Sequence, residues 1–138
     1  MLNAINEINW IGVFLGTVTN FFLGGLWFTA LFAKLYAIAL GKENEPKQKP
    51  APIYLIGPLF CGLITTFTLA ILFRILKIDS LGNAISIGTL VGFGFLATTT
   101  INTAINPNIP RPLLYGFVSG LFFVVSTILV SIILFKFM

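Results

Sequence analysis

The sequence has no histidine, a single cysteine and few charged residues for a chain of 138 residues. The absence of histidine removes the commonest metal and haem ligand and the commonest proton shuttle at neutral pH. One cysteine, Cys61, excludes an intrachain disulfide. Charged residues make up 9% of the chain and hydrophobic residues 57%, which is far from the composition of soluble proteins. These features predict one membrane domain, residues 1–138, with no metal and no cofactor.

Charge is also absent from the interior of every long apolar run. The basic residues lie between the runs or at their ends: Lys34, Lys42, Lys47, Lys49, Arg74, Lys77, Arg111 and Lys136. The same holds for the acidic residues Glu7, Glu43, Glu45 and Asp79. Charge in such positions sets the orientation of a membrane protein. Binding of nucleic acid needs a basic face with elements that read phosphates or bases, and no partner of that class is expected.

Four apolar runs are long enough to cross a lipid bilayer as helices. They cover about residues 8–33, 53–73, 83–105 and 113–135, and about 20 apolar residues are needed to span the hydrocarbon. In lipid, only helices and closed barrels satisfy all backbone polar groups. The sequence therefore predicts an all-α fold, an integral membrane antiparallel four-helix bundle.

Proline and glycine mark the ends of the runs. Three prolines lie in the polar loop 42–52, and three more precede the fourth run, so neither segment is expected to be helical. Residues 35–40 are predicted to carry the first helix along the membrane surface, with Gly41 as its stop. Pro58 lies in the first turns of the second run, where its missing N–H is expected to cost little.

The basic residues also predict on which side the chain ends lie. The first and third loops together hold Lys34, Lys42, Lys47, Lys49 and Arg111. The opposite side holds Arg74, Lys77 and Lys136. Because cytoplasmic loops carry the excess of Lys and Arg, this difference predicts that both termini lie outside the cytoplasm.

Small residues recur at four-residue spacing in all four runs. In the first run they are Gly12, Gly16 and Gly24, and Asn20 falls in the same row. The other runs contribute Gly57, Cys61, Gly88, Gly92, Gly116 and Gly120. In lipid, helices associate where small residues let their backbones approach closely. The spacing predicts packing seams, either within one chain or between copies of it.

Few polar side chains inside the runs could carry chemistry. A candidate polar path comprises Asn20, Thr99, Asn102, Thr103 and Arg111. The alternative is that Asn20 forms one hydrogen bond between helices and that threonine hydroxyls bond to carbonyls one turn earlier. Hydroxyls and amides do not titrate near neutral pH, and general acid–base catalysis needs groups that do. No catalytic activity is therefore expected.

Several short motifs resemble those of a known family. They are Asn9-Trp10, LGGLWF at 23–28, LFAK at 31–34, Thr99-x-x-Asn102 and Arg111-Pro112. In these motifs the chain is similar to DUF1761, a bacterial membrane family of unknown function. Where that family tends to have Trp-Tyr and a proline soon after, this chain has Trp27-Phe28 and Ala30, so a tyrosine hydroxyl is missing. The resemblance implies four helices in a bacterial plasma membrane, and it implies no substrate, cofactor or catalytic residue.

Together these observations predict a small membrane protein that acts through helix packing. Its partners would be the lipid bilayer and either further copies of itself or a membrane complex in which it is an accessory subunit. Two alternatives stay open. One is a small channel or carrier with a path lined by Thr and Asn, and the other is a protein whose apolar grooves hold a lipid or a quinone.

Overall fold

The structure is a computed structural model and describes residues 5–46 and 51–138. Four helices in it are long and apolar enough to cross a membrane: Trp10–Leu31, Ile53–Ile75, Leu81–Ala104 and Pro112–Lys136. Each of the four apolar runs thus forms a helix of this kind, with ends close to the predicted ones. Lys47 and Lys49 of the predicted polar loop lie outside the described residues.

The first span and the residues directly after it form three helical segments. The helix α2 (Trp10–Leu26) begins at Asn9, whose side-chain oxygen accepts hydrogen bonds from two amides of the first turn, as is common at helix starts. A π-helical turn, η1 (Trp27–Leu31), continues it, and α3 (Ala33–Ala39) follows. Gly41, with φ of +69°, adopts the left-handed conformation that ends helices, as predicted.

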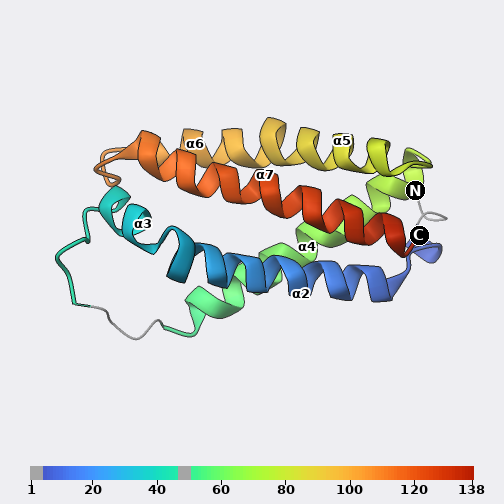
Figure 1. The fold of residues 1–138 in the computed structure, drawn as a ribbon, viewed down its shortest axis with the longest axis horizontal. Coiled ribbons are helices and arrows are strands. Elements are labelled where there is room, and N and C mark those ends of the chain that lie inside the picture. Colours follow the sequence, from blue (N-terminus) through green and yellow to red (C-terminus); the bar gives the residue numbers. More distant parts are fainter. Residues whose placement is uncertain (1–4, 47–50) are drawn as a thin grey trace.

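The other spans differ in regularity. The second is one helix, α4 (Ile53–Ile75), and the fourth is α7 (Pro112–Lys136). The third span is made of α5 (Leu81–Val91), the π-helical segment η2 (Gly92–Ala97) and α6 (Thr98–Ala104). The start of α2 and the end of α7 lie at the same end of the molecule (Figure 1), as an even number of spans requires.

The helix α7 is the centre of the arrangement. It lies between the third span and α2, whereas α4 crosses obliquely behind α2 (Figure 1). The helix α4 packs mainly on α2 and to a lesser extent on α7. The four predicted helices are present, but their packing differs from that of a regular four-helix bundle, because α4 has few contacts beyond α2.

Two apolar clusters form the interior. The larger one lies where all four spans meet and consists of Ile8, Val13, Leu69, Ala70, Phe73, Ile78, Ala84, Val130 and Leu134. The smaller one is formed by Trp27 of η1 with Val118 and Phe122 of α7. The helix α4 contributes to the first cluster only, so one end of the molecule is held together by fewer helices.

The first nine residues of α4, which we call the free segment (residues 53–61), are not packed against other helices. Eight are exposed, and Gly57 has no atom within 4 Å of an added Cβ. Pro58 is the sixth residue of α4, so its missing N–H leaves the carbonyl of Tyr54 without its usual donor. The small cost expected from the sequence holds only for a proline in the first turn.

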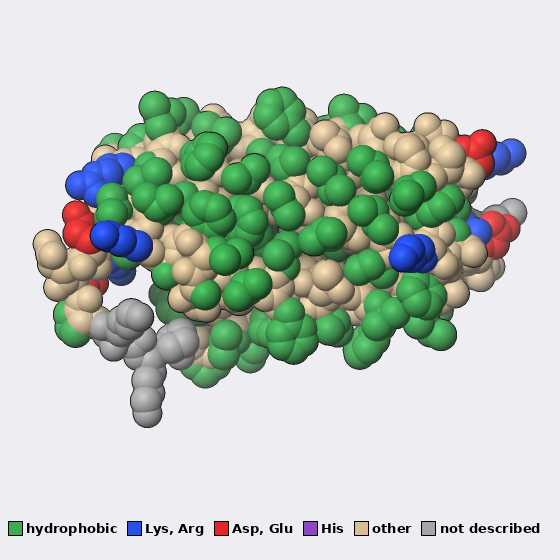
Figure 2. Space-filling model, viewed as in Figure 1, with side chains coloured by type: hydrophobic (Ala, Val, Ile, Leu, Met, Phe, Trp, Pro, Cys, Tyr) green, Lys and Arg blue, Asp and Glu red, His purple; other side chains and the backbone are tan. Residues whose placement is uncertain are grey.

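The surface divides into an apolar middle and charged ends. Apolar side chains cover the visible face along the helices, whereas most Lys, Arg, Asp and Glu side chains gather towards the two ends (Figure 2). This distribution fits a bilayer around the middle of the helices, with charged groups in the headgroup regions.

Candidate functional site

The row of small residues on α2 faces α7 of the same chain. A Cβ added at Gly12 would lie 3.0 Å from the Cβ of Phe137, and one added at Gly24 would lie 3.4 Å from the ring of Phe122. The two helices therefore run in opposite directions along this seam. Small residues are needed there because the helices approach more closely than larger side chains would permit.

Asn20, in the middle of this row, lies where three helices meet. Its side-chain oxygen accepts a hydrogen bond from the hydroxyl of Ser126 on α7. A Cβ at Gly62 on α4 would collide with its amide nitrogen. One turn away, a Cβ at Gly16 would lie 2.9 Å from a methyl group of Thr66, also on α4. Asn20 thus links α2 to α7 and packs directly against the backbone of α4.

A second seam joins the third span to a neighbouring face of α7, since Thr127 of this seam directly follows Ser126, which contacts α2. A Cβ at Gly88 would lie 2.8 Å from the main-chain carbonyl of Thr127, and one at Gly92 would lie 2.9 Å from the Cα of Val124. Both distances are to backbone atoms, which cannot move aside as a side chain can. The two glycines therefore determine how closely the third span approaches α7.

The π-helical segment η2 shifts by one position the residue of the third span that faces α7 in this second seam. After Gly92 the next seam position is Ala97, five residues on, whose Cβ lies 3.3 Å from an added Cβ at Gly120. With α-helical spacing the larger Leu96 would lie nearest that position. A π-bulge adds one residue to a turn, and here it brings the smaller side chain to the seam. The seam then continues through Ile101 and Gly116.

Two of the predicted packing residues take no part in these seams. Gly57 has no neighbour within 4 Å of an added Cβ, and Cys61 is exposed. The small buried residues of α4 are Gly62 and Thr66 instead. Neighbouring residues in a helix point about 100° apart. The predicted residues Gly57 and Cys61 therefore do not lie on the face of α4 that packs within the chain.

The residues of the predicted polar path are not brought together. Asn20 is partly buried between helices, whereas Thr99, Asn102 and Thr103 are exposed on α6. Arg111 precedes α7, and its guanidinium group pairs with Glu43 at 3.5 Å. Within one chain, these five residues do not line a common path.

A row of buried hydroxyl groups on α7 is more prominent than the sequence suggested. Ser119, Ser126, Thr127 and Ser131 are all buried, and Thr127 donates to the carbonyl of Phe123 at 2.7 Å. The hydroxyls of Ser119 and Ser131 have no partner in the described part of the chain. The same part has no cluster of three or more Cys, Asp or Glu side chains that could hold a metal ion. The interior polar groups are thus small and uncharged.

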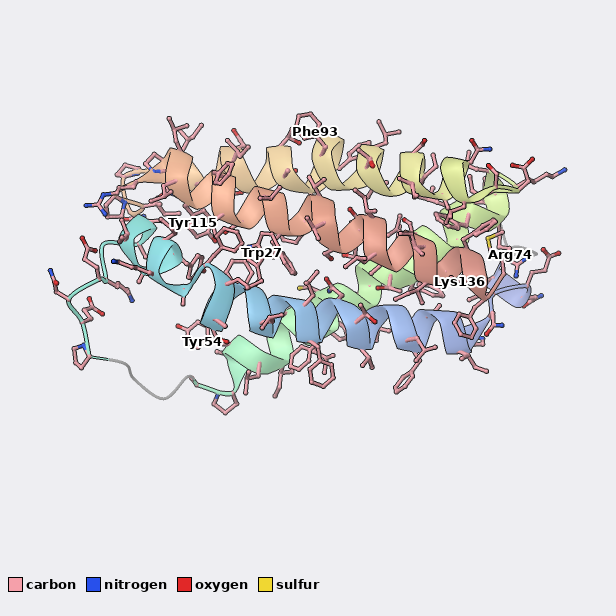
Figure 3. The ribbon with its side chains drawn as sticks, in the orientation of Figure 1. Trp27, Tyr54, Arg74, Phe93, Tyr115 and Lys136 are labelled. Atoms are coloured by element: carbon pink, nitrogen blue, oxygen red, sulfur yellow. The ribbon has the colours of Figure 1, made fainter. Side chains whose placement is uncertain are left out.

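Trp27 is a buried residue that the sequence reasoning treated only as part of a motif. Its indole N–H donates to the main-chain carbonyl of Val118 at 3.0 Å, and its ring stacks on Phe32 at a centroid distance of 4.5 Å. Figure 3 shows Trp27 between η1 and α7, whereas Phe93 and Tyr54 project outwards. The signal in the sequence was a tryptophan followed by aromatic residues at helical spacing, which is typical of a packed cluster.

The same aromatic cluster continues into α3. The ring centroids of Tyr36 and Tyr115 are 5.6 Å apart. Burial, and then the neighbouring Tyr115 phenol, raises the pKa of Tyr36 well above its usual value of 10. Tyr36 is therefore neutral at physiological pH and acts as a packing residue.

These features define a class of protein: an all-helical chain with four candidate membrane spans, joined through seams of small residues around α7. The chain belongs to the DUF1761 family, described as a protein of unknown function, and matches it over residues 11–135. The resemblance found in the sequence motifs is confirmed. No curated protein and no solved structure matches the chain.

Proposed function

We propose that the protein is a non-catalytic membrane subunit that acts by packing against another membrane protein, through the free segment of α4. The partner is a second copy of the chain or a component of a larger membrane complex. The proposal keeps the predicted orientation in a bacterial plasma membrane, with both termini outside the cytoplasm. The observation that carries it is the exposure of the free segment on every side.

The first support is that most small-residue seams are already occupied. The seam glycines Gly12, Gly16, Gly24, Gly88, Gly92, Gly116 and Gly120 contact other segments of the same chain. They are thus not available to bind a partner. Of the predicted packing residues, Gly57 and Cys61 of the free segment are the two without such a contact among the described residues.

The second support is the composition of the free segment. Ile53, Tyr54, Leu55 and Ile56 are exposed by 66%, 70%, 53% and 62%. Nine helical residues cover about two and a half turns, so these exposed side chains point in all directions. The first and third spans each have one side packed on α7. The free segment instead has surface left for a partner on several sides.

Oxidative crosslinking in native membranes tests the version with two copies. Because Cys61 is the only cysteine, a disulfide-linked dimer can form only between two Cys61 residues whose Cα atoms come within about 7 Å. We expect a dimer at low expression level, lost in Cys61→Ser. Gly57→Leu should weaken it by blocking close approach. Gly25→Leu is the matched control, because Gly25 also has no atom within 4 Å of an added Cβ.

Purification in mild detergent tests the version with another subunit. In that case Cys61 gives no dimer, but a second membrane protein copurifies with the chain and is lost in Gly57→Leu and retained in Gly25→Leu. A monomer with neither a crosslink nor a copurifying protein would contradict the proposal.

A second candidate function, binding of a lipid chain, is favoured by one observation. The outer face of the third span has an apolar depression lined by Ile85, Ser86, Thr89, Leu90, Phe93 and Gly94. The hydroxyls of Ser86 and Thr89 are used within the helix, at 2.9 Å from the carbonyls of Gly82 and Ile85, so the depression suits an acyl chain. Native mass spectrometry should detect retained lipid that decreases in Phe93→Ala. Equal lipid retention in both proteins would exclude this site.

A further inference from the structure

The helix α4 changes from unpacked to packed at one residue. Residues 53–61 are unpacked, as described above, whereas Gly62, Thr66, Leu69, Ala70 and Phe73 are buried. Gly62 is the first buried residue, and it is held by the side chain of Asn20. On the other side of this boundary, a Cβ added at Gly57 would have no atom within 4 Å. The packed and unpacked parts of α4 are therefore free to differ in mobility.

The backbone of the free segment is also weakened at its middle. Pro58 has no N–H to donate to the carbonyl of Tyr54, and its ring crowds that carbonyl, which are the usual causes of a kink. Gly57, which directly precedes it, has no side chain to limit the backbone. A helix that loses a backbone hydrogen bond is normally held straight by its neighbours. Residues 53–56 and 58–61 are exposed, so among the described residues no helix covers the free segment in this way.

We propose that residues 53–57 form an arm that swings in the bilayer about a hinge at Gly57 and Pro58, while α4 from Gly62 onward stays fixed to α2 and α7. The hinge is a property of the isolated chain. It therefore does not depend on whether the proposed partner exists. If the partner does exist, the hinge lets the arm adjust its direction to it.

Distance measurements between pairs of spin labels test the hinge on the full chain in lipid nanodiscs, in a Cys61→Ser background. One pair, Leu55→Cys with Phe93→Cys, joins the arm to the third span. The matched pair, Ile75→Cys with Phe93→Cys, joins the packed end of α4 to the same reference. All three positions are exposed, by 53%, 45% and 65%, so the labels disturb little packing. We expect a broader distance distribution for the pair on the arm.

Restoring the missing hydrogen bond gives the decisive comparison. Pro58→Ala together with Gly57→Ala should narrow the distribution measured from Leu55 and leave that from Ile75 unchanged. Pro52→Ala, a proline just before α4, is the control and should change neither. Equal widths for the two pairs in the parent chain would overturn the hinge. A broad distribution from Leu55 that persists in the double variant would overturn it as well, because the motion would then arise elsewhere.

Discussion

Arg111 donates a hydrogen bond from Nη1 to the main-chain carbonyl of Ile38, at 2.9 Å and across 73 positions in the sequence. Its own amide donates to the carbonyl of Ala39 at 3.3 Å. The last carbonyls of a helix lack partners within the helix and carry partial negative charge, so a guanidinium group suits them. Arg111 therefore fastens the end of α3 to the start of α7. This is a structural role, whereas the sequence suggested a polar path.

Replacing Arg111 should loosen α3. We expect Arg111→Ala to lower the free energy of unfolding by about 1–2 kcal/mol, since hydrogen bonds from charged groups are lost at a half-exposed site. Unfolding by SDS in mixed micelles measures the change, and proteolysis should become faster near residues 40–46. Glu43→Gln is the control. It should cost less than about 1 kcal/mol, because the ion pair is exposed to solvent. An equal effect of both variants would contradict the proposed role of the Ile38 contact.

Asn20 and Gly62 should be coupled energetically. Asn20→Ala removes the hydrogen bond with Ser126 and should cost about 0.6–2 kcal/mol. In the parent chain, Gly62→Ala should lower the free energy of unfolding by about 1–3 kcal/mol, because the new methyl group would collide with the Asn20 amide. In the Asn20→Ala background the same change should cost much less, since the obstructing side chain is gone. A double-mutant cycle of unfolding free energies measures this coupling, and additive effects would show that Asn20 does not occupy the space beside Gly62.

Because η2 contains one residue more than an α-helical turn, we expect the fold to tolerate a one-residue deletion within it. Removing Phe95, which is exposed by 63%, makes Ala97 the fourth residue after Gly92, so an α-helical turn can replace the bulge with the seam intact. Removing Leu90 instead turns Gly88 and the preceding residues by about 100° relative to the rest of the span. We expect the first deletion to keep the fold and the second to cost more than about 3 kcal/mol through overpacking. Thermal unfolding of both variants tests the prediction, which fails if they are equally unstable.

Tyr36 predicts a loss of stability at alkaline pH. Burial raises the pKa of Tyr36 in the folded chain. The contribution of Tyr36 to folding stability is therefore fully present at pH values below its pKa in the unfolded chain, which is about 10. It is lost as the pH rises above that value, because the unfolded chain releases the proton more readily. Thermal unfolding between pH 8 and about 11.5 should show this decrease. Tyr36→Phe should reduce the decrease, with Tyr54→Phe as the control on the free segment, and an unchanged pH profile in Tyr36→Phe would refute the assignment.

Much of the fold could be predicted from local chemistry. The four spans follow from the length and apolarity of the runs, because backbone polar groups in lipid require helices. The stop at Gly41 follows from its freedom to adopt positive φ. The row of Gly12, Gly16 and Gly24 was also readable as a seam. Only the structure identified its partner as α7 of the same chain.

The candidate site was less predictable, because its members depend on contacts between distant segments. The sequence allowed either a polar path that joins Asn20 to residues of α6 or one interhelical hydrogen bond of Asn20. The structure shows the hydrogen bond, and only the structure identifies its partner as Ser126 and places Gly62 beside it. For α4, two rows of small residues about 100° apart were both compatible with the sequence. Which row is buried depends on the angle at which α4 crosses α2. That angle is set by side chains from both helices, so neither helix determines it alone.

The sequence by itself determined the class of this protein: its composition, its four apolar runs and its family. It did so because these properties depend on local apolarity and on backbone hydrogen bonds within each helix. The tertiary structure decided the central position of α7, the one-residue adjustment at η2 and the unpacked start of α4. These depend on how closely two helix backbones can approach, which is fixed only when both surfaces are in place.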